Sequence, residues 1–285
     1  MHVDGVDLGV STVGDPADPA ILLISGAAAS MDWWDEGFCE RLAAGHRFVI
    51  RYDHRDTGRS VGYPAGAPGY TFVDLTNDAV GLLDAYGVDR GHLVGISMGG
   101  GIAQRLVVCH PERVASLTLI ATSSTGPGGP DNPDVPPMAD HLAAYFADPP
   151  PPPDWTDRDA VIDHLVAGQR AFGGALTFDE DRVRAVAGRV FDRTRDMAAS
   201  QTNHWLLGGD GTPTRARLGE VTVPTLVIHG TADPLFPLGH GELLAKEIPG
   251  AELLALDGVG HQAPPPGTWD VVVPAILHVT SGGGP

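Results

Sequence analysis

Cysteine and long apolar runs are scarce in this chain of 285 residues. The two cysteines, Cys39 and Cys109, could form one disulfide at most. Neither has a Cys or His neighbour at the spacing of a zinc site, so no metal is expected. No run reaches the roughly 18 apolar residues that a membrane-spanning helix needs. The sequence therefore predicts a globular protein in which apolar side chains, rather than disulfides or a metal, form the core.

Basic residues are scarce as well, and lysine almost missing. Eighteen Lys and Arg stand against 36 Asp and Glu, which gives a formal net charge of −18. A surface of this sign repels phosphates and anionic lipids, so neither nucleic acid nor membrane is expected as a partner. The opening residues 1–4 lack the features of a signal peptide, and a cytoplasmic location is the expectation. The expected partner is a small-molecule substrate, no cofactor is called for, and nothing indicates an oligomeric state.

Short apolar runs alternate with longer helical patterns along most of the chain. The predicted strands are residues 20–24, 47–52, 92–96, 115–121, 222–228 and 251–256. The predicted helices are residues 71–86, 98–109, 239–248 and 269–279. Strands that alternate with helices form parallel crossovers. The predicted fold class is therefore α/β, with a doubly wound, mostly parallel sheet that binds its ligand at the carboxyl ends of the strands.

The alternation stops between about residues 123 and 218. A Pro/Gly-rich stretch covers 126–137, five prolines run from 149 to 153, and the rest has helical patterns, as at 157–172 and 178–196. We interpret 123–218 as a mostly helical lid inserted into a core made of residues 1–122 and 219–285. The proline run is compatible with a partner-binding segment, but a stiff connection between lid helices is the favoured interpretation.

The sharpest chemical signal is the G-x-S-x-G motif from Gly95 to Gly99, placed between a predicted strand and a predicted helix. An abrupt strand-to-helix turn forces its central residue, Ser97, into a strained backbone conformation and exposes the hydroxyl at the strand tip. The flanking glycines leave room for the neighbouring backbone. Ser97 is therefore the predicted nucleophile, although a small residue in an ordinary tight turn would show the same pattern.

A serine hydroxyl needs an adjacent base and an acid that orients it. Asp233 follows the predicted strand 222–228, and His261 lies in a glycine-rich loop after the strand 251–256. The order serine, acid, histidine is the one found with such strand-to-helix serines. Asp233 could instead be a cap or turn residue, and Asp257 is a competing acid, but its place four residues before the histidine favours a role in shaping the loop.

Acyl transfer also requires donors for the oxyanion that develops on the substrate. One predicted donor is the backbone N–H of Met98, the residue after the nucleophile. The other is expected in the small-residue loop 25–30, where Ala27 is the chosen donor and Gly26 lets the substrate approach closely. An ordinary turn of small residues is the alternative for this loop.

Three further residues are predicted to contact substrate. Trp33 and Trp34, at the start of the next expected helix, either wall an apolar pocket or pack beneath the lid. His204, next to Trp205, lies where the lid returns to the core and could reach the pocket.

With these pieces placed, nearly the whole chain resembles the α/β-hydrolase superfamily, and within it the aclacinomycin methylesterase-like, polyketide-tailoring esterases. The segments behind the resemblance are 14–20 (GDPADPA), 51–60 (RYDHRDTGRS) and 221–228 (VTVPTLVI). The resemblance implies Ser97 as nucleophile, Asp233 as acid, His261 as base, and Ala27 with Met98 as oxyanion donors. It also implies hydrolysis of a carboxylic ester, such as a methyl ester of an aromatic polyketide.

Two departures from the family pattern matter. Many relatives have His-Gly or Gly-Gly where this chain has Ser25-Gly26-Ala27, and the proline-rich lid differs more strongly. The lid puts the substrate in doubt, and two other classes of function stay open because a fold alone does not fix function. One is a different reaction on the same three residues, namely cofactor-free perhydrolysis of the haloperoxidase kind, C–C bond hydrolysis or decarboxylation. The other is a non-catalytic ligand-binding protein.

Overall fold

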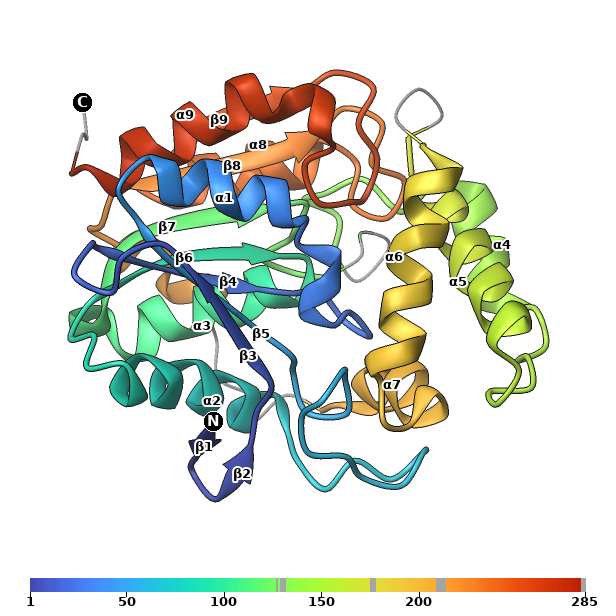
Figure 1. The fold of residues 1–285 in the computed structure, drawn as a ribbon. Helices are drawn as coiled ribbons and strands as arrows, with labels where there is room; N and C mark the ends of the chain where they lie inside the picture. The colour runs from blue at the N-terminus through green and yellow to red at the C-terminus, as the bar shows by residue number, and fades with distance from the viewer. Residues whose placement is uncertain (127, 129–131, 175–177, 209–213, 283–285) are drawn as a thin grey trace.

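A twisted central sheet organises the molecule (Figure 1). The computed structural model describes residues 1–126, 128, 132–174, 178–208 and 214–282. Within them, seven strands pair in the order β3-β5-β4-β6-β7-β8-β9. Their bounds are β3 Val10–Val13, β4 Ala20–Ile24, β5 Phe48–Tyr52, β6 Gly91–Ile96, β7 Val114–Ile120, β8 Thr225–Gly230 and β9 Glu252–Leu256. A separate hairpin joins β1 (His2–Val3) to β2 (Val6–Asp7).

All neighbouring strands of the large sheet run parallel except the edge strand β3, which is antiparallel to β5. The prediction of a mostly parallel sheet is thus confirmed. The sequence analysis missed β3 because it is short and lies at the edge. Its four residues are exposed or half-buried, so they lack the continuous apolar run of a strand covered on both faces.

Helices cover both faces of the sheet, as expected for a doubly wound fold. On one face lie α2 (Phe72–Ala85), α3 (Met98–Cys109) and α8 (Gly239–Glu247), and on the other α1 (Glu36–Ala44) and α9 (Trp269–Thr280). Each face has its own apolar core, because alternate side chains of a strand point to opposite faces. Cys39 and Cys109 are free thiols, the first buried and the second partly buried.

One predicted helix start was wrong. Met31–Trp33 forms a 3₁₀ turn, and α1 begins only at Glu36. The side chain of Asp35 accepts a hydrogen bond from the N–H of Gly37 and caps the helix there. The N-cap therefore sets the helix start, later than the apolar pattern suggested.

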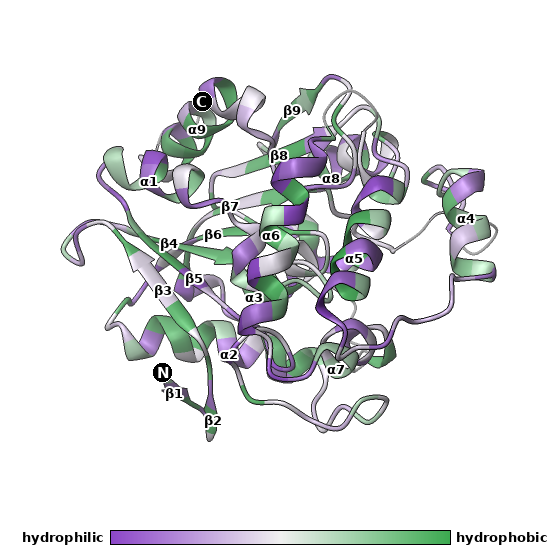
Figure 2. Ribbon diagram, turned by 45° about the vertical axis from the view of Figure 1, so that its right-hand side comes forward, coloured by the Kyte–Doolittle hydropathy of each residue, from purple (hydrophilic) through white to green (hydrophobic). Residues whose placement is uncertain are grey.

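The described part of the segment predicted as a lid, between β7 and β8, contains the α-helices α4 (Asp140–Ala147), α5 (Arg158–Phe172), α6 (Glu180–Arg193) and α7 (Met197–Thr202). They stand beyond the carboxyl ends of the parallel strands (Figure 1). Helices α5 and α6 bury a small core of their own, which includes Val161, Leu165 and Val186. Figure 2 shows apolar residues on these helices beside strongly polar ones, as amphipathic helices require. Residues 127, 129–131, 175–177 and 209–213 of this segment lie outside the described residues.

Among the described residues, no helix is both long and apolar enough to span a membrane.

Candidate active site

Ser97 occupies a sharp turn between β6, which ends at Ile96, and α3, which begins at Met98. Its backbone has φ +52° and ψ −119°, a strained conformation for any residue with a side chain. The glycines of the motif are required by close backbone contacts. A Cβ at Gly95 would lie 2.3 Å from the carbonyl oxygen of Gly99, and one at Gly99 would lie 2.2 Å from that of Ile24. The motif therefore builds the turn that the sequence analysis assigned to it.

The three residues predicted from separate strand tips lie in one hydrogen-bonded chain. Nε2 of His261 is 3.0 Å from Oγ of Ser97, and Nδ1 of His261 is 2.8 Å from Oδ2 of Asp233. An ionised carboxylate only accepts, so we assign the ring proton to Nδ1, which leaves Nε2 to accept from the serine hydroxyl.

The Asp233 carboxylate is buried and firmly held. Its second oxygen, Oδ1, accepts hydrogen bonds from the backbone N–H groups of Leu235 and Phe236, both at 2.9 Å. Burial raises the pKa of Asp233, but His261, His229 and the Phe236 N–H lower it by more than burial raises it. The net pKa of Asp233 therefore lies below its ordinary value. The carboxylate is thus ionised at neutral pH and positioned to orient the imidazole.

Aromatic side chains flank His261. Its ring centroid is 5.4 Å from that of Phe236 and 6.0 Å from that of Phe172, at the end of lid helix α5. The His261 N–H also donates to the Phe172 carbonyl oxygen at 2.8 Å. The sequence analysis missed both phenylalanines. Phe172 belongs to the lid segment and Phe236 to the loop after β8, and no local pattern indicates that either ring reaches His261. The competing acid Asp257 is exposed and accepts a hydrogen bond from Thr231.

The predicted oxyanion loop lies against the serine. A Cβ at Gly26 would be 3.4 Å from Ser97 Cβ and 3.9 Å from its Oγ, so the loop backbone passes beside the hydroxyl. In the described part of the chain, no hydrogen bond uses the N–H of Ala27, whereas that of Ala28 donates to His204. Met98 is the first residue of α3, where a helix leaves its N–H groups unpaired.

The remaining predicted contact residues lie in three different settings. Trp34 is buried in the core and stacks on Phe38, with centroids 6.0 Å apart. Trp33 packs against the lid core formed by α5 and α6. His204 is buried beside the oxyanion loop, and both of its ring nitrogens contact backbone groups. Their contact with a substrate stays a prediction.

The loop that follows β5 joins the core to the lid. Asp53 in this loop is fully buried, and its carboxylate accepts hydrogen bonds from the N–H groups of Met31 and Arg59 and from Arg193 at the end of α6. Arg193 also pairs with Asp32. Burial raises the pKa of Asp53, which the two N–H groups and Arg193 oppose. The segment 51–60 is buried except for Arg59, and its Asp53 links the loop before α1 to the end of α6.

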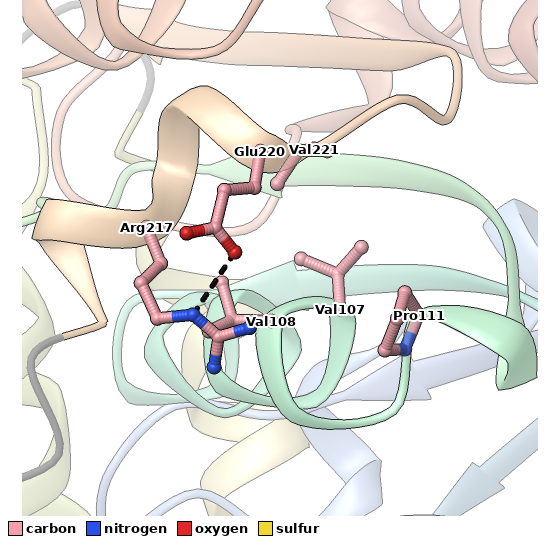
Figure 3. Close-up of a pocket in the computed structure, with 6 residues that line it drawn as sticks. All are labelled: Val107, Val108, Pro111, Arg217, Glu220 and Val221. Atoms are coloured by element: carbon pink, nitrogen blue, oxygen red, sulfur yellow. Dashed lines mark hydrogen bonds and ion pairs between the residues drawn. The ribbon is translucent and has the colours of Figure 1, made fainter.

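A small hollow lies well away from these residues, at the far end of α3 (Figure 3). Arg217 donates to Glu220 across it, at 3.0 Å. Val107 in its wall is ten positions beyond Ser97 on the same helix, about 15 Å along the axis. The six residues lining it are Val107, Val108, Pro111, Arg217, Glu220 and Val221. This hollow does not belong to the candidate active site.

Comparison with known proteins agrees with this architecture. Residues 19–265 match the family described as the alpha/beta hydrolase fold, and the chain belongs to that family. Rhodomycin D methylesterase DauP of Streptomyces sp. (strain C5) is 34% identical over 92% of this chain and 91% of its own. The carbamate hydrolase RutD of Variovorax paradoxus (strain S110), a putative assignment, is 33% identical over 87% of both chains.

Among solved structures, the esterase RhEst1 from Rhodococcus sp. ECU1013 superposes with a TM-score of 0.74 at 24% identity, over 99% of this chain and 97% of that one. At this identity the likeness shows the fold alone. The first relative confirms the resemblance to methylesterases noted in the sequence, and the family and its relatives confirm the prediction of a hydrolase.

Proposed function

We propose that the protein hydrolyses a carboxylic ester through an acyl-enzyme on Ser97. The observation that carries the proposal is the hydrogen-bonded chain from Ser97 through His261 to Asp233, built on a strained strand-to-helix turn. The hydrogen-bond distances from Nε2 of His261 to Ser97 Oγ and from Nδ1 to the buried Asp233 carboxylate support the proposal, because nucleophilic catalysis by serine requires a base and an orienting acid.

The reaction has two halves. Nε2 of His261 takes the Ser97 proton while Oγ bonds to the ester carbonyl carbon, and the carbonyl electron pair moves onto its oxygen. As that pair returns, the bond to the alcohol breaks, and the departing oxygen takes the proton from Nε2. Water then repeats the sequence on the acyl-enzyme, so that Ser97 leaves with its proton and the acid is released. Asp233 keeps its charge throughout and stabilises the imidazolium.

The N–H groups of Ala27 and Met98 would bind the developing oxyanion. The two N–H groups belong to the loop after β4 and to the start of α3, on either side of Ser97. Neither donates a hydrogen bond to another described residue. The positive end of the α3 helix adds to their effect.

A methyl ester of an aromatic polyketide or a similar apolar compound is the proposed substrate. Support comes from the rhodomycin D methylesterase activity named for the 34% identical relative. The rings of Phe172 and Phe236 beside His261 provide apolar, aromatic surface next to the reacting atoms.

The test is intact mass after treatment with a fluorophosphonate, together with turnover of p-nitrophenyl acetate and of aromatic methyl esters. We expect one adduct and turnover in the wild type, and neither in Ser97→Ala with an unchanged circular dichroism spectrum. A folded wild type that gives no adduct and no turnover would contradict the proposal. Peroxide-dependent halogenation of monochlorodimedone in acetate would instead favour a perhydrolase, and ligand-induced thermal stabilisation without turnover a binding protein.

A further inference from the structure

His204 and Gln201, near the end of the lid segment, both form hydrogen bonds to the backbone of Ala28 in the oxyanion loop. The N–H of Ala28 donates to Nδ1 of His204 at 2.9 Å, and Nε2 of Gln201 donates to the Ala28 carbonyl oxygen at 3.1 Å. We propose that His204, with Gln201, is a positioning residue that fixes the Ala27 N–H for oxyanion binding. The inference rests on the proposed ester hydrolysis and adds to it that the lid segment sets the rate of the chemical step.

The contacts of His204 define its tautomer. A backbone N–H faces Nδ1, which must therefore accept, and the Arg55 carbonyl oxygen lies 3.0 Å from Nε2, which must therefore donate. The ring is buried between the two segments and stands nearly perpendicular to the His54 ring, at 85°, with centroids 5.7 Å apart. Burial lowers the pKa of His204 to about 4, so the neutral ring needed for this pair of bonds is present at neutral pH.

Ala28 needs such support because its backbone is strained. Its φ is +57°, in the left-handed region that a residue with a Cβ adopts only at a cost. Strained residues persist where the surroundings over-determine them. Here His204 binds the N–H of Ala28 and Gln201 binds its carbonyl oxygen. These bonds fix the peptide group between Ala27 and Ala28, which directly follows the N–H of Ala27 in the backbone.

Core residues hold the two ends of the same loop. Nε2 of His54 lies 3.0 Å from the Ser25 carbonyl oxygen, and the Asp53 carboxylate accepts from the Met31 N–H at 2.9 Å. The lid therefore holds the middle of a loop whose ends the core holds. The Ala27 N–H lies between these anchors and has no partner among the described residues.

Loss of the hydrogen bonds to Ala28 should weaken stabilisation of the transition state more than binding of the substrate. Removing an oxyanion donor outright lowers kcat by about 10²- to 10³-fold, because the donor acts on charge that develops only in the reaction. A displaced donor retains part of its effect, so we expect about a tenfold to hundredfold loss in kcat with KM changed less than about threefold.

Three substitutions of His204 separate its two hydrogen bonds. His204→Asn places an acceptor oxygen near the position of Nδ1 and keeps the bond to Ala28. His204→Gln places a donor near the position of Nε2 and keeps the bond to Arg55. His204→Phe keeps the ring and neither bond. We expect kcat within about threefold of wild type for the first variant, and the full loss for the other two.

Gln201→Met provides a second variant, since its side chain is only partly buried and the protein should fold normally. We expect a loss of about threefold to tenfold in kcat. His164→Asn is the matched control, because this lid histidine contacts Trp155 and lies in α5, whereas Gln201 lies in α7 and His204 follows it. We expect unchanged kinetics for it.

Inhibition by a trifluoromethyl ketone distinguishes displacement of the Ala27 N–H from general destabilisation of the fold. The ketone forms a tetrahedral adduct whose oxygen occupies the oxyanion site, so its inhibition constant should rise in proportion to the loss in kcat/KM across the variants. The melting temperature of each variant is measured alongside, and only folded variants are compared.

The outcomes separate this inference from the proposed function. A wild type without turnover or adduct removes the proposed function and this inference with it. If the wild type is active, equal kcat in wild type, His204→Gln and Gln201→Met overturns the inference alone. Equal losses in His204→Asn and His204→Gln, or losses that the ketone does not follow, would also overturn it, because they would show that His204 only stabilises the fold.

Discussion

Buried histidines should make this protein sensitive to mild acid. Burial lowers the pKa of His54 to about 3 and that of His92 and His204 to about 4, from an ordinary value of 6.5. The unfolded chain therefore binds protons at these side chains below pH 6.5, whereas the folded chain binds them at His92 and His204 only near pH 4 and at His54 only near pH 3. Stability that is fully present above pH 6.5 is lost as the pH falls toward 4.

The size of the effect follows from these values. Each pH unit below 6.5 costs about 1.4 kcal/mol per histidine, which amounts to about 2 kcal/mol each at pH 5 and about 6 kcal/mol for the three together. Domains are stable by about 5 to 15 kcal/mol, so this loss is a large part of the total stability of a domain. Burial raises the pKa of Asp53 and Asp78, which acts in the opposite sense at acid pH. A difference between two variants is therefore the sharper measure.

His92 is the best residue for that difference, because it lies in β6 away from the predicted active site. Its Nδ1 is 2.9 Å from the Ser116 hydroxyl, and the charges of Arg47 and Arg90 add to burial in lowering its pKa. His92→Asn keeps a polar atom near Nδ1 but does not titrate. Urea unfolding at pH 8 and pH 5 should show the wild type losing about 2 kcal/mol more than the variant. Equal losses in the two proteins would refute the reasoning.

Three further predictions concern the site and its supports. Asp233→Asn should lower kcat by about 10³- to 10⁴-fold with an unchanged fold, because the amide cannot orient the imidazole as the carboxylate does; a loss below tenfold would contradict the assigned role. Gly99→Ala should abolish fluorophosphonate labelling, because its Cβ would lie 2.2 Å from a backbone oxygen of β4. At Gly168 a Cβ would have no atom within 4 Å, so Gly168→Ala should stabilise the protein by about 0.5 to 1 kcal/mol in urea unfolding. Arg193→Met should cost about 3 kcal/mol, since it leaves a buried carboxylate without its cation, while Arg158→Met, at an exposed ion pair, should change the unfolding midpoint little.

The core of the fold was accessible from local sequence patterns. Continuous apolar runs predicted β4 and β6 to within a residue, and the pattern from 98 to 109 predicted α3 with both of its bounds. The proximity of Ser97, Asp233 and His261 could be predicted because each follows a strand, and parallel strands end at the same edge of a sheet. Their hydrogen bonds span up to 164 positions in the sequence, but the topology alone brings them together.

Helices between β7 and β8 could be predicted from the sequence, but their contacts could not. These helices have ordinary amphipathic patterns, which predict that each buries one face without specifying where. His204 shows the consequence. The sequence placed it near the pocket as a substrate contact, yet its nitrogens bind backbone groups 176 and 149 positions away. No local pattern encodes such pairs, because a backbone N–H or carbonyl looks the same at every residue. They depend on the whole lid packing against the core, for which the Arg193–Asp53 ion pair is one anchor. Our proposal for His204 therefore leads us to expect that substitutions at the contacts between the lid segment and loop 25–30 alter kcat.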